Sequence, residues 1–221
     1  MYLSCKKGRS EPNVVKTIVK EAFALGYRHF DCAYVYENEK EIGEALKEIP
    51  RDQVWITSKL WNTFHQPSMV RKAIDETLSD LGLKQLDLYL VHWPIAFVND
   101  GTGNSAKDAN GVSMVDASCS LTETWKAMEA LVDAGLVKSI GVSNFSISKL
   151  KLILEHARIK PAVNQVILYS VSRRAFAPLT QYDRLNCTRI SPNTSSSPSA
   201  RRTGSMSRHT LLSGLTLKMV S

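Results

Sequence analysis

Apolar and polar positions in residues 14–166 alternate between the period of a helix and the short runs of a strand. The first segment, NVVKTIVKEAFALG, has apolar residues at 14, 15, 18, 19, 22, 23 and 25 and ends at a glycine, which predicts a helix. Four later segments also predict helices, at 38–49, 66–83, 121–136 and 146–159. The apolar or β-rich segments between them predict strands, at 27–31, 53–60, 86–93, 137–145 and 161–168.

This repeated alternation of strand and helix predicts a parallel sheet with crossover helices, either doubly wound or a (β/α) barrel. LDLYLVHW (86–93) is nearly all apolar, which suits a strand buried on both faces. No GxGxxG follows the first strand, so the dinucleotide fingerprint of the doubly wound fold is absent. The polar segment at 96–120 predicts a long loop that shapes a pocket. In a barrel, functional groups come from the carboxyl ends of several strands.

Polar residues stand at the carboxyl end of every predicted strand: Asp31, Lys59, His92, Ser143 with Asn144, and Asn164 with Gln165. Tyr36 follows Asp31 in the turn that enters the next helix, where its phenol reaches the same opening. Tyr34 is the residue we expect to pack or to line the pocket. A ring of polar side chains at one end of a barrel predicts a functional site.

The types of these residues suit proton donation to an oxygen. A tyrosine hydroxyl has a pKa of about 10, and a neighbouring ammonium such as that of Lys59 lowers it. Asp31 would hold Lys59 in place, and a neutral His92 would orient a carbonyl oxygen. This set would protonate a developing alkoxide, and the hydride that completes carbonyl reduction implies a nicotinamide. The residues suited to hydrogen-bond a carboxamide are Ser143, Asn144 and Gln165.

Four segments, in order, resemble hallmarks of the aldo-keto reductase family: GYRHFDCAYVYENEKEIG, WITSKLW, DLYLVHWP and LVKSIGVSNF. The resemblance covers about residues 10–166 and is nearest to the aldose, xylose and glycerol-type reductase branch. It implies a (β/α)8 TIM-type barrel that binds NADP(H) and reduces aldehydes and ketones to alcohols. It implies a catalytic tetrad of Asp31, Tyr36, Lys59 and His92, with Tyr36 as general acid. It also implies nicotinamide contacts from Ser143, Asn144 and Gln165, and pocket aromatics at Trp61 and Trp93.

The two ends of the chain depart from that family. MYLSCKKGRSEPN is too short for both the floor hairpin and the first barrel strand. From Arg173 onward there is no Glu and no Trp, and helical periodicity fails. We therefore expect a partial barrel of about five to six strand–helix units in 1–171 and an irregular, poorly ordered Ser/Arg-rich tail in 172–221. Two apolar segments, VILYSV (166–171) and HTLLSGLTLKMV (209–220), are candidates for replacement strands.

Two functions follow as hypotheses. The first is an NADP(H)-dependent oxidoreductase that acts on small carbonyl or polyol substrates. The alternative is an impaired or inactive remnant of such an enzyme, frameshifted or alternatively spliced, that acts at most as a binding protein.

The charge distribution, the apolar runs and the cysteine spacing bear on whether the protein binds nucleic acid, a membrane or a metal. The net charge of +7 arises entirely within 173–221, so it gives no sign of a nucleic-acid ligand for the main domain. No apolar run is long enough for a membrane span, and the first residues lack the apolar core of a secretory signal. The four cysteines have neither CxxC nor metal-ligand spacing, which predicts free thiols and no metal site. We expect a cytoplasmic monomer.

Overall fold

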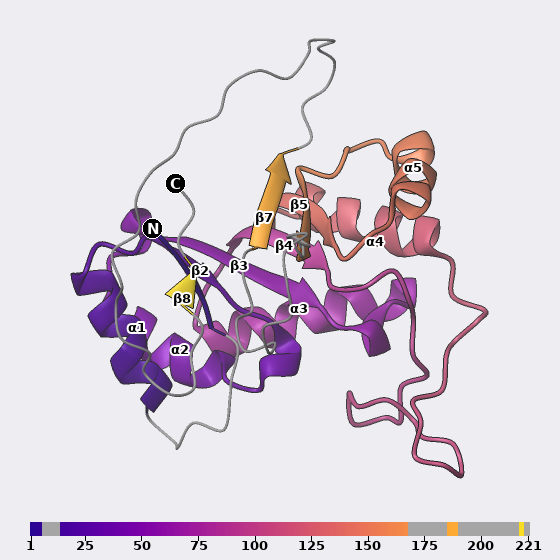
Figure 1. The fold of residues 1–221 in the computed structure, drawn as a ribbon, viewed down its shortest axis with the longest axis horizontal. Helices are drawn as coiled ribbons and strands as arrows, with labels where there is room; N and C mark the ends of the chain where they lie inside the picture. The colour runs from indigo at the N-terminus through magenta and orange to yellow at the C-terminus, as the bar shows by residue number, and fades with distance from the viewer. Residues whose placement is uncertain (6–13, 168–184, 190–216, 219–221) are drawn as a thin grey trace, which may run out of the picture.

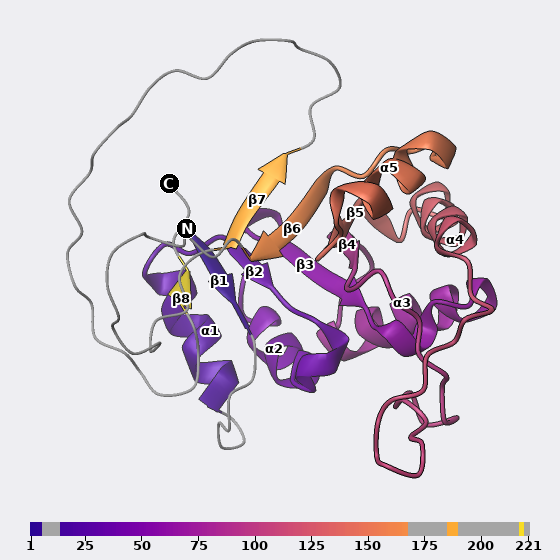
Figure 2. The same cartoon turned by 45° about the vertical axis from the view of Figure 1, so that its right-hand side comes forward.

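A curled parallel sheet with helices on its outer face forms the body of the protein (Figures 1 and 2). The computed structural model describes residues 1–5, 14–167, 185–189 and 217–218. The sheet has the strand order β7-β6-β5-β4-β3-β2-β1-β8. Its parallel strands are β1 (Tyr2–Ser4), β2 (His29–Asp31), β3 (Trp55–Leu60), β4 (Leu86–Val91), β5 (Val137–Ser143) and β6 (Val163–Ile167). At the two ends, β7 (Leu185–Arg189) and β8 (Leu217–Lys218) pair antiparallel with β6 and β1.

Five helices connect the parallel strands and pack side by side in chain order. They are α1 (Val14–Ala24), α2 (Glu39–Leu46), α3 (Pro67–Leu81), α4 (Leu121–Asp133) and α5 (Ile147–His156). Gly82 ends α3 in the left-handed conformation, with φ of 65°, which glycine adopts without steric strain. Ser146 caps α5, since its hydroxyl accepts a hydrogen bond from the Lys149 backbone N–H at 3.4 Å. The helices and parallel strands predicted from the sequence are confirmed, with ends shifted by a few residues.

The hydrophobic core lies between the sheet and these helices. Its largest fully buried apolar side chains include Trp125 from α4, Phe30 from β2 and Ile74 from α3. At Gly43 in α2 a side chain is excluded, because a Cβ there would collide with the backbone carbonyl oxygen of Asp80 at the end of α3. This glycine therefore sets how closely α2 approaches α3.

The first parallel strand, β1, is an element that the sequence pattern did not predict. Tyr2–Ser4 pairs with His29–Asp31 in register, although only three residues take part. A strand this short carries too little alternation to be recognised from its sequence. Within the described part of the chain the sheet therefore has six parallel strands, at the upper end of the expected range.

The segment at 96–120 is a long loop, as predicted, held by three isolated bridges within itself. It is tied to the turn after β3: the Thr63 hydroxyl donates to the Gly103 carbonyl oxygen at 2.7 Å, and the Phe97 N–H donates to the Asn62 carbonyl oxygen at 2.9 Å. The loop extends away from the sheet at the lower right of Figure 1.

Most of the predicted tail at 172–221 lies outside the described residues, so its expected order and its domain boundary stay predictions. Its described parts are the short strands β7 and β8, and β8 falls within HTLLSGLTLKMV. Among the described residues, no helix is both long enough and apolar enough to cross a membrane.

Candidate active site

The carboxyl ends of three neighbouring parallel strands bring the first candidate residues together. Asp31 is the last residue of β2, Lys59 lies one residue before the end of β3, and His92 directly follows β4. Because β2, β3 and β4 are adjacent and parallel, these ends lie along one rim of the sheet. The sequence order strand–helix–strand is what places them there.

Asp31 and Lys59 form a buried ion pair at this rim. The Lys59 ammonium donates to Asp31 Oδ1 at 2.6 Å and to the Cys32 carbonyl oxygen at 2.8 Å, and both side chains are 2% exposed. Burial by itself would lower the pKa of Lys59, but the charges of Asp31 and Tyr36 outweigh it and the net shift is upward. Lys59 is therefore a cation fixed in place near neutral pH.

Tyr36 reaches the same rim from a single 3-10 turn, Tyr34–Tyr36, that follows β2. The Lys59 ammonium lies 5.2 Å from the centroid of its ring. Burial raises the pKa of Tyr36, the charge of Lys59 opposes this, and the net shift is upward. The expected effect of Lys59 is thus present, but desolvation of the phenolate exceeds it. Tyr34 packs edge-on against Phe64, with ring centroids 5.1 Å apart, as expected of a packing residue.

His92 lies between the tyrosine and the two candidate pocket aromatics. Its ring centroid is 6.0 Å from that of Tyr36 and 5.3 Å from that of Trp61, both edge-on. Trp93 lies nearly parallel to the imidazole at 6.5 Å and is 45% exposed. Trp61 also contacts Phe97 of the long loop, with centroids 6.4 Å apart. The imidazole is therefore bordered by aromatic surface that leads from the rim to solvent.

The three candidate carboxamide residues lie on the next two strands. Ser143 ends β5 opposite Gln165 of β6, and its hydroxyl donates to the Gln165 carbonyl oxygen at 2.9 Å. Asn144 takes the left-handed conformation, with φ of 62°, and its amide nitrogen donates to the His92 carbonyl oxygen at 2.9 Å. This bond ties the end of β5 to the end of β4 and fixes the side chain of Asn144.

Tyr2 is a residue of this site that the sequence interpretation missed. Its hydroxyl donates to Asp31 Oδ2 at 2.5 Å, and the Gln165 amide nitrogen donates to the Tyr2 hydroxyl at 3.0 Å and to Asp31 Oδ2 at 3.4 Å. Curling of the sheet brings β6 across to β1 and β2, since these partners are 163 and 134 positions apart in sequence. MYLSC has four apolar residues and one polar residue, a run too short to identify a strand.

The residues of β5 and β6 suit the nicotinamide end of a dinucleotide. With their nitrogens already used as donors, Asn144 and Gln165 each keep a side-chain oxygen that can accept from the N–H groups of a carboxamide. These two acceptor oxygens suit the N–H donors of a nicotinamide carboxamide, so Asn144 and Gln165, together with Ser143, would hold it.

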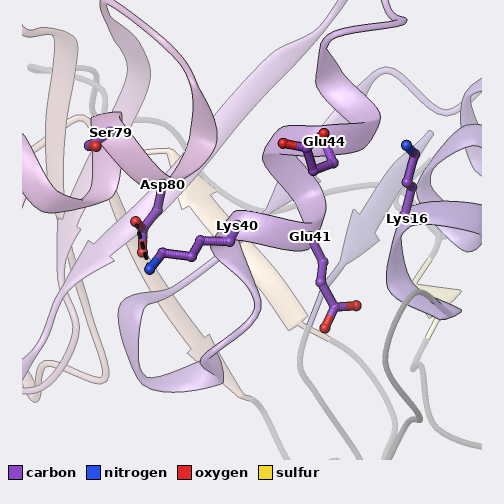
Figure 3. Close-up of a pocket in the computed structure, with 6 residues that line it drawn as sticks. All are labelled: Lys16, Lys40, Glu41, Glu44, Ser79 and Asp80. Carbon is purple, nitrogen blue, oxygen red and sulfur yellow. Dashed lines mark ion pairs between the residues drawn. The ribbon is translucent and has the colours of Figure 1, made fainter.

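A surface hollow of about 600 Å³ lies elsewhere, on the outside of the helices (Figure 3). Its lining is formed by Lys16, Lys40, Glu41, Glu44, Ser79 and Asp80. Lys40 points across it to Asp80, with 3.8 Å between the ammonium and the carboxylate. None of the strand-end residues takes part, so this hollow is separate from the rim.

Comparison with known proteins agrees with the fold and the motifs. The model of the Aldo/keto reductase family matches residues 1–185. Aldo-keto reductase family 1 member A1 of Rattus norvegicus is 52% identical over 165 residues, which cover 72% of this chain and 50% of that protein. Aldose reductase B of Dictyostelium discoideum is 53% identical over 158 residues, covering 67% of this chain and 50% of that protein.

Solved structures of two aldose reductases superpose on this chain. That of Giardia lamblia gives a TM-score of 0.71 at 46% identity and covers 76% of this chain and 56% of its own. That of Schistosoma japonicum gives 0.70 at 50% identity, with 75% and 56% covered. The predicted class, a partial barrel of TIM type, is confirmed. The chain spans about half the length of the curated relatives it matches.

Proposed function

The chain belongs to the aldo/keto reductase family, and on that premise we propose that it reduces small aldehydes and ketones to alcohols with NADPH. The observation that carries the proposal is the group formed by Tyr36, the buried Lys59–Asp31 pair and His92 at one rim of the sheet. A phenol, an ammonium, a carboxylate and an imidazole in contact form a proton donor with a fixed charge beside it.

Each of these side chains has a separate task in the proposed reaction. NADPH, held by Ser143, Asn144 and Gln165, would supply the hydride for the carbonyl carbon. Tyr36 is protonated near neutral pH, because burial holds its pKa above the ordinary value of 10, and it transfers its proton to the carbonyl oxygen. The Lys59 cation stabilises the phenolate left behind, and Asp31 keeps that cation in position. His92 orients the carbonyl oxygen towards Tyr36.

The substrate and cofactor would meet between two groups of side chains. Trp61 and Trp93, which border His92, provide apolar surface for the carbon skeleton of the substrate. Ser143, Asn144 and Gln165 would hold the carboxamide of the nicotinamide. The choice of NADP(H) over NAD(H), a cytoplasmic location and a monomeric state are part of the proposal and rest on the family resemblance.

Turnover and cofactor binding test the proposal separately. The 221-residue chain should oxidise NADPH in the presence of an aromatic aldehyde and bind NADPH in a fluorescence titration. Tyr36→Phe should lower kcat at least about 100-fold, the usual contribution of general acid catalysis, with little change in the Kd of NADPH. Tyr34→Phe, which removes a phenol hydroxyl two residues away, is the matched control and should retain activity. A Tyr36→Phe variant with wild-type kcat would refute the assignment.

The second candidate is a protein that binds a partner without catalysing a reaction. The observation in its favour is that the described sheet has six parallel strands, whereas the barrel of the family has eight. The same NADPH titration separates the two candidates. A wild-type chain that is folded but binds no NADPH supports the binding protein and excludes the reductase.

A further inference from the structure

The hydroxyl of Tyr2 joins two parts of the rim that come from opposite ends of the parallel sheet. It donates to Asp31 Oδ2 at 2.5 Å, while Lys59 occupies Oδ1 at 2.6 Å. It accepts from the amide nitrogen of Gln165 at 3.0 Å. Tyr2 is 5% exposed and its ring packs edge-on against His29, with centroids 4.8 Å apart. The two hydrogen bonds of the Tyr2 hydroxyl, which we call the Tyr2 bridge, are therefore buried. The ring of Tyr2 is held in place by His29.

For Asp31, this bond matters because the carboxylate is buried. A buried carboxylate oxygen without a donor is costly, and a hydrogen bond to a charged group is roughly twice as strong as one between neutral groups. Without the Tyr2 hydroxyl, the one hydrogen bond that the described residues leave to Oδ2 is the longer contact from the Gln165 amide nitrogen, at 3.4 Å. Asp31 would then be less firmly oriented towards Lys59, and Lys59 less firmly placed beside Tyr36.

For Gln165, the same bridge decides which end of the amide faces the rim. A carboxylate only accepts hydrogen bonds, so the amide nitrogen must point to Asp31 and Tyr2. The amide oxygen then remains as the acceptor that a nicotinamide carboxamide needs. If the Gln165 amide were rotated by half a turn, its NH2 group would face the N–H group of the carboxamide, and no hydrogen bond would form between these two donors.

We propose that Tyr2 is a positioning residue that fixes Asp31 and Gln165 relative to each other, and so joins the proton-donating side chains to those that hold the nicotinamide. This inference rests on the proposed reductase function. It assigns Tyr2 no contact with the reacting atoms, because it acts through Asp31 and Gln165.

A double-mutant cycle on NADPH binding tests the link to Gln165. In the 221-residue chain, Tyr2→Phe keeps the ring and removes the hydroxyl that links Asp31 to Gln165, and we expect the Kd of NADPH to rise about threefold. In a Gln165→Leu background there is no amide left to orient, so the same substitution should leave Kd unchanged. A loss of packing alone would raise Kd equally in both backgrounds. Tyr27→Phe, which removes a hydroxyl from another buried tyrosine, is the control and should bind NADPH as the wild type does.

Turnover tests the link to Asp31. We expect Tyr2→Phe to lower kcat about tenfold without changing the KM of the aldehyde. Circular dichroism checks that each variant is folded, and Tyr2→Met, which also lacks the hydroxyl, repeats both measurements should the phenylalanine variant not fold.

The outcomes separate this inference from the function on which it rests. An unchanged kcat, or the same rise in Kd in both backgrounds, overturns the role of Tyr2 while the wild type remains a reductase. A wild type that binds NADPH without turnover refutes the reductase, and the binding cycle still decides the role of Tyr2. A wild type that binds no NADPH overturns both.

Discussion

Glu39 is a buried acid whose removal should change how the stability of the protein depends on pH. It lies in the first turn of α2 and is 4% exposed. Its two carboxylate oxygens accept from the hydroxyls of Ser58 at 2.5 Å and Thr77 at 3.1 Å. Burial raises its pKa from 4.5 to about 7, against the opposing effect of these two hydrogen bonds. Glu39→Gln keeps the shape of this side chain and removes its charge.

The sign follows from where the proton is bound. Between pH 4.5 and about 7 the folded protein holds a proton on Glu39 that the unfolded chain has released. The free energy of unfolding therefore falls as pH rises through this window and stays lower above it. Each pH unit between the two pKa values, 4.5 and about 7, lowers the free energy of unfolding by about 1.4 kcal/mol, so the whole loss is about 3 kcal/mol. His29 and His65 act in the opposite direction, because burial lowers the pKa of each from 6.5 to about 4.

Subtracting the free energy of unfolding of the wild type from that of the variant removes the contribution of the two histidines, because both proteins contain them. We expect Glu39→Gln to match the wild type or to be about 1 kcal/mol less stable near pH 5, since its amide satisfies the two hydroxyls less well. Between pH 5 and about pH 8, the free energy of unfolding of the variant should rise by about 3 kcal/mol relative to that of the wild type. Urea unfolding followed by tryptophan fluorescence, at several pH values in this range, measures the difference.

Glu44→Gln is the matched control, because Glu44 lies on the same helix, is exposed and pairs with Lys47. The free energy of unfolding of Glu44→Gln, relative to that of the wild type, should be the same at every pH in this range. A Glu39→Gln difference that is equally flat would show that Glu39 is ionised throughout the range in the folded protein, and would refute the reasoning from burial.

Three further substitutions should reduce stability for different reasons, each measured by urea unfolding at neutral pH. Lys59→Met leaves Asp31 buried without its ammonium and should lower the free energy of unfolding by about 3 kcal/mol or more; a loss below about 1 kcal/mol would contradict a buried pair. Gly43→Ala places a Cβ against the Asp80 carbonyl oxygen and should lower the free energy of unfolding by about 1–3 kcal/mol. An unchanged midpoint of the urea transition would mean that α2 and α3 can move apart without cost. Ser146→Ala removes the cap of α5 and should lower the free energy of unfolding by about 1 kcal/mol, whereas no loss would show that the cap contributes nothing.

Local sequence patterns were enough to predict the helices and strands of the main body and the residues that carry the chemistry. Helical stripes such as that of α1 and the apolar run of β4 are local patterns, because the period of side-chain burial is set by the backbone geometry of each element. The positions of Asp31, Lys59 and His92 at strand ends followed from the same patterns. Parallel strands joined by helices place these ends on one rim, so the rim was predictable before any contact was known.

Which side chains meet, and how their surroundings shift their pKa values, depends on how the whole chain folds. The bridge from Tyr2 to Asp31 and Gln165 depends on the curl of the whole sheet, since its partners lie far apart in the chain. The net upward shift in the pKa of Tyr36 likewise depends on burial, which is set by everything packed around the phenol. Local patterns specify elements because their causes lie within a few residues. Contacts and desolvation arise from long-range packing, and no short stretch of sequence contains it.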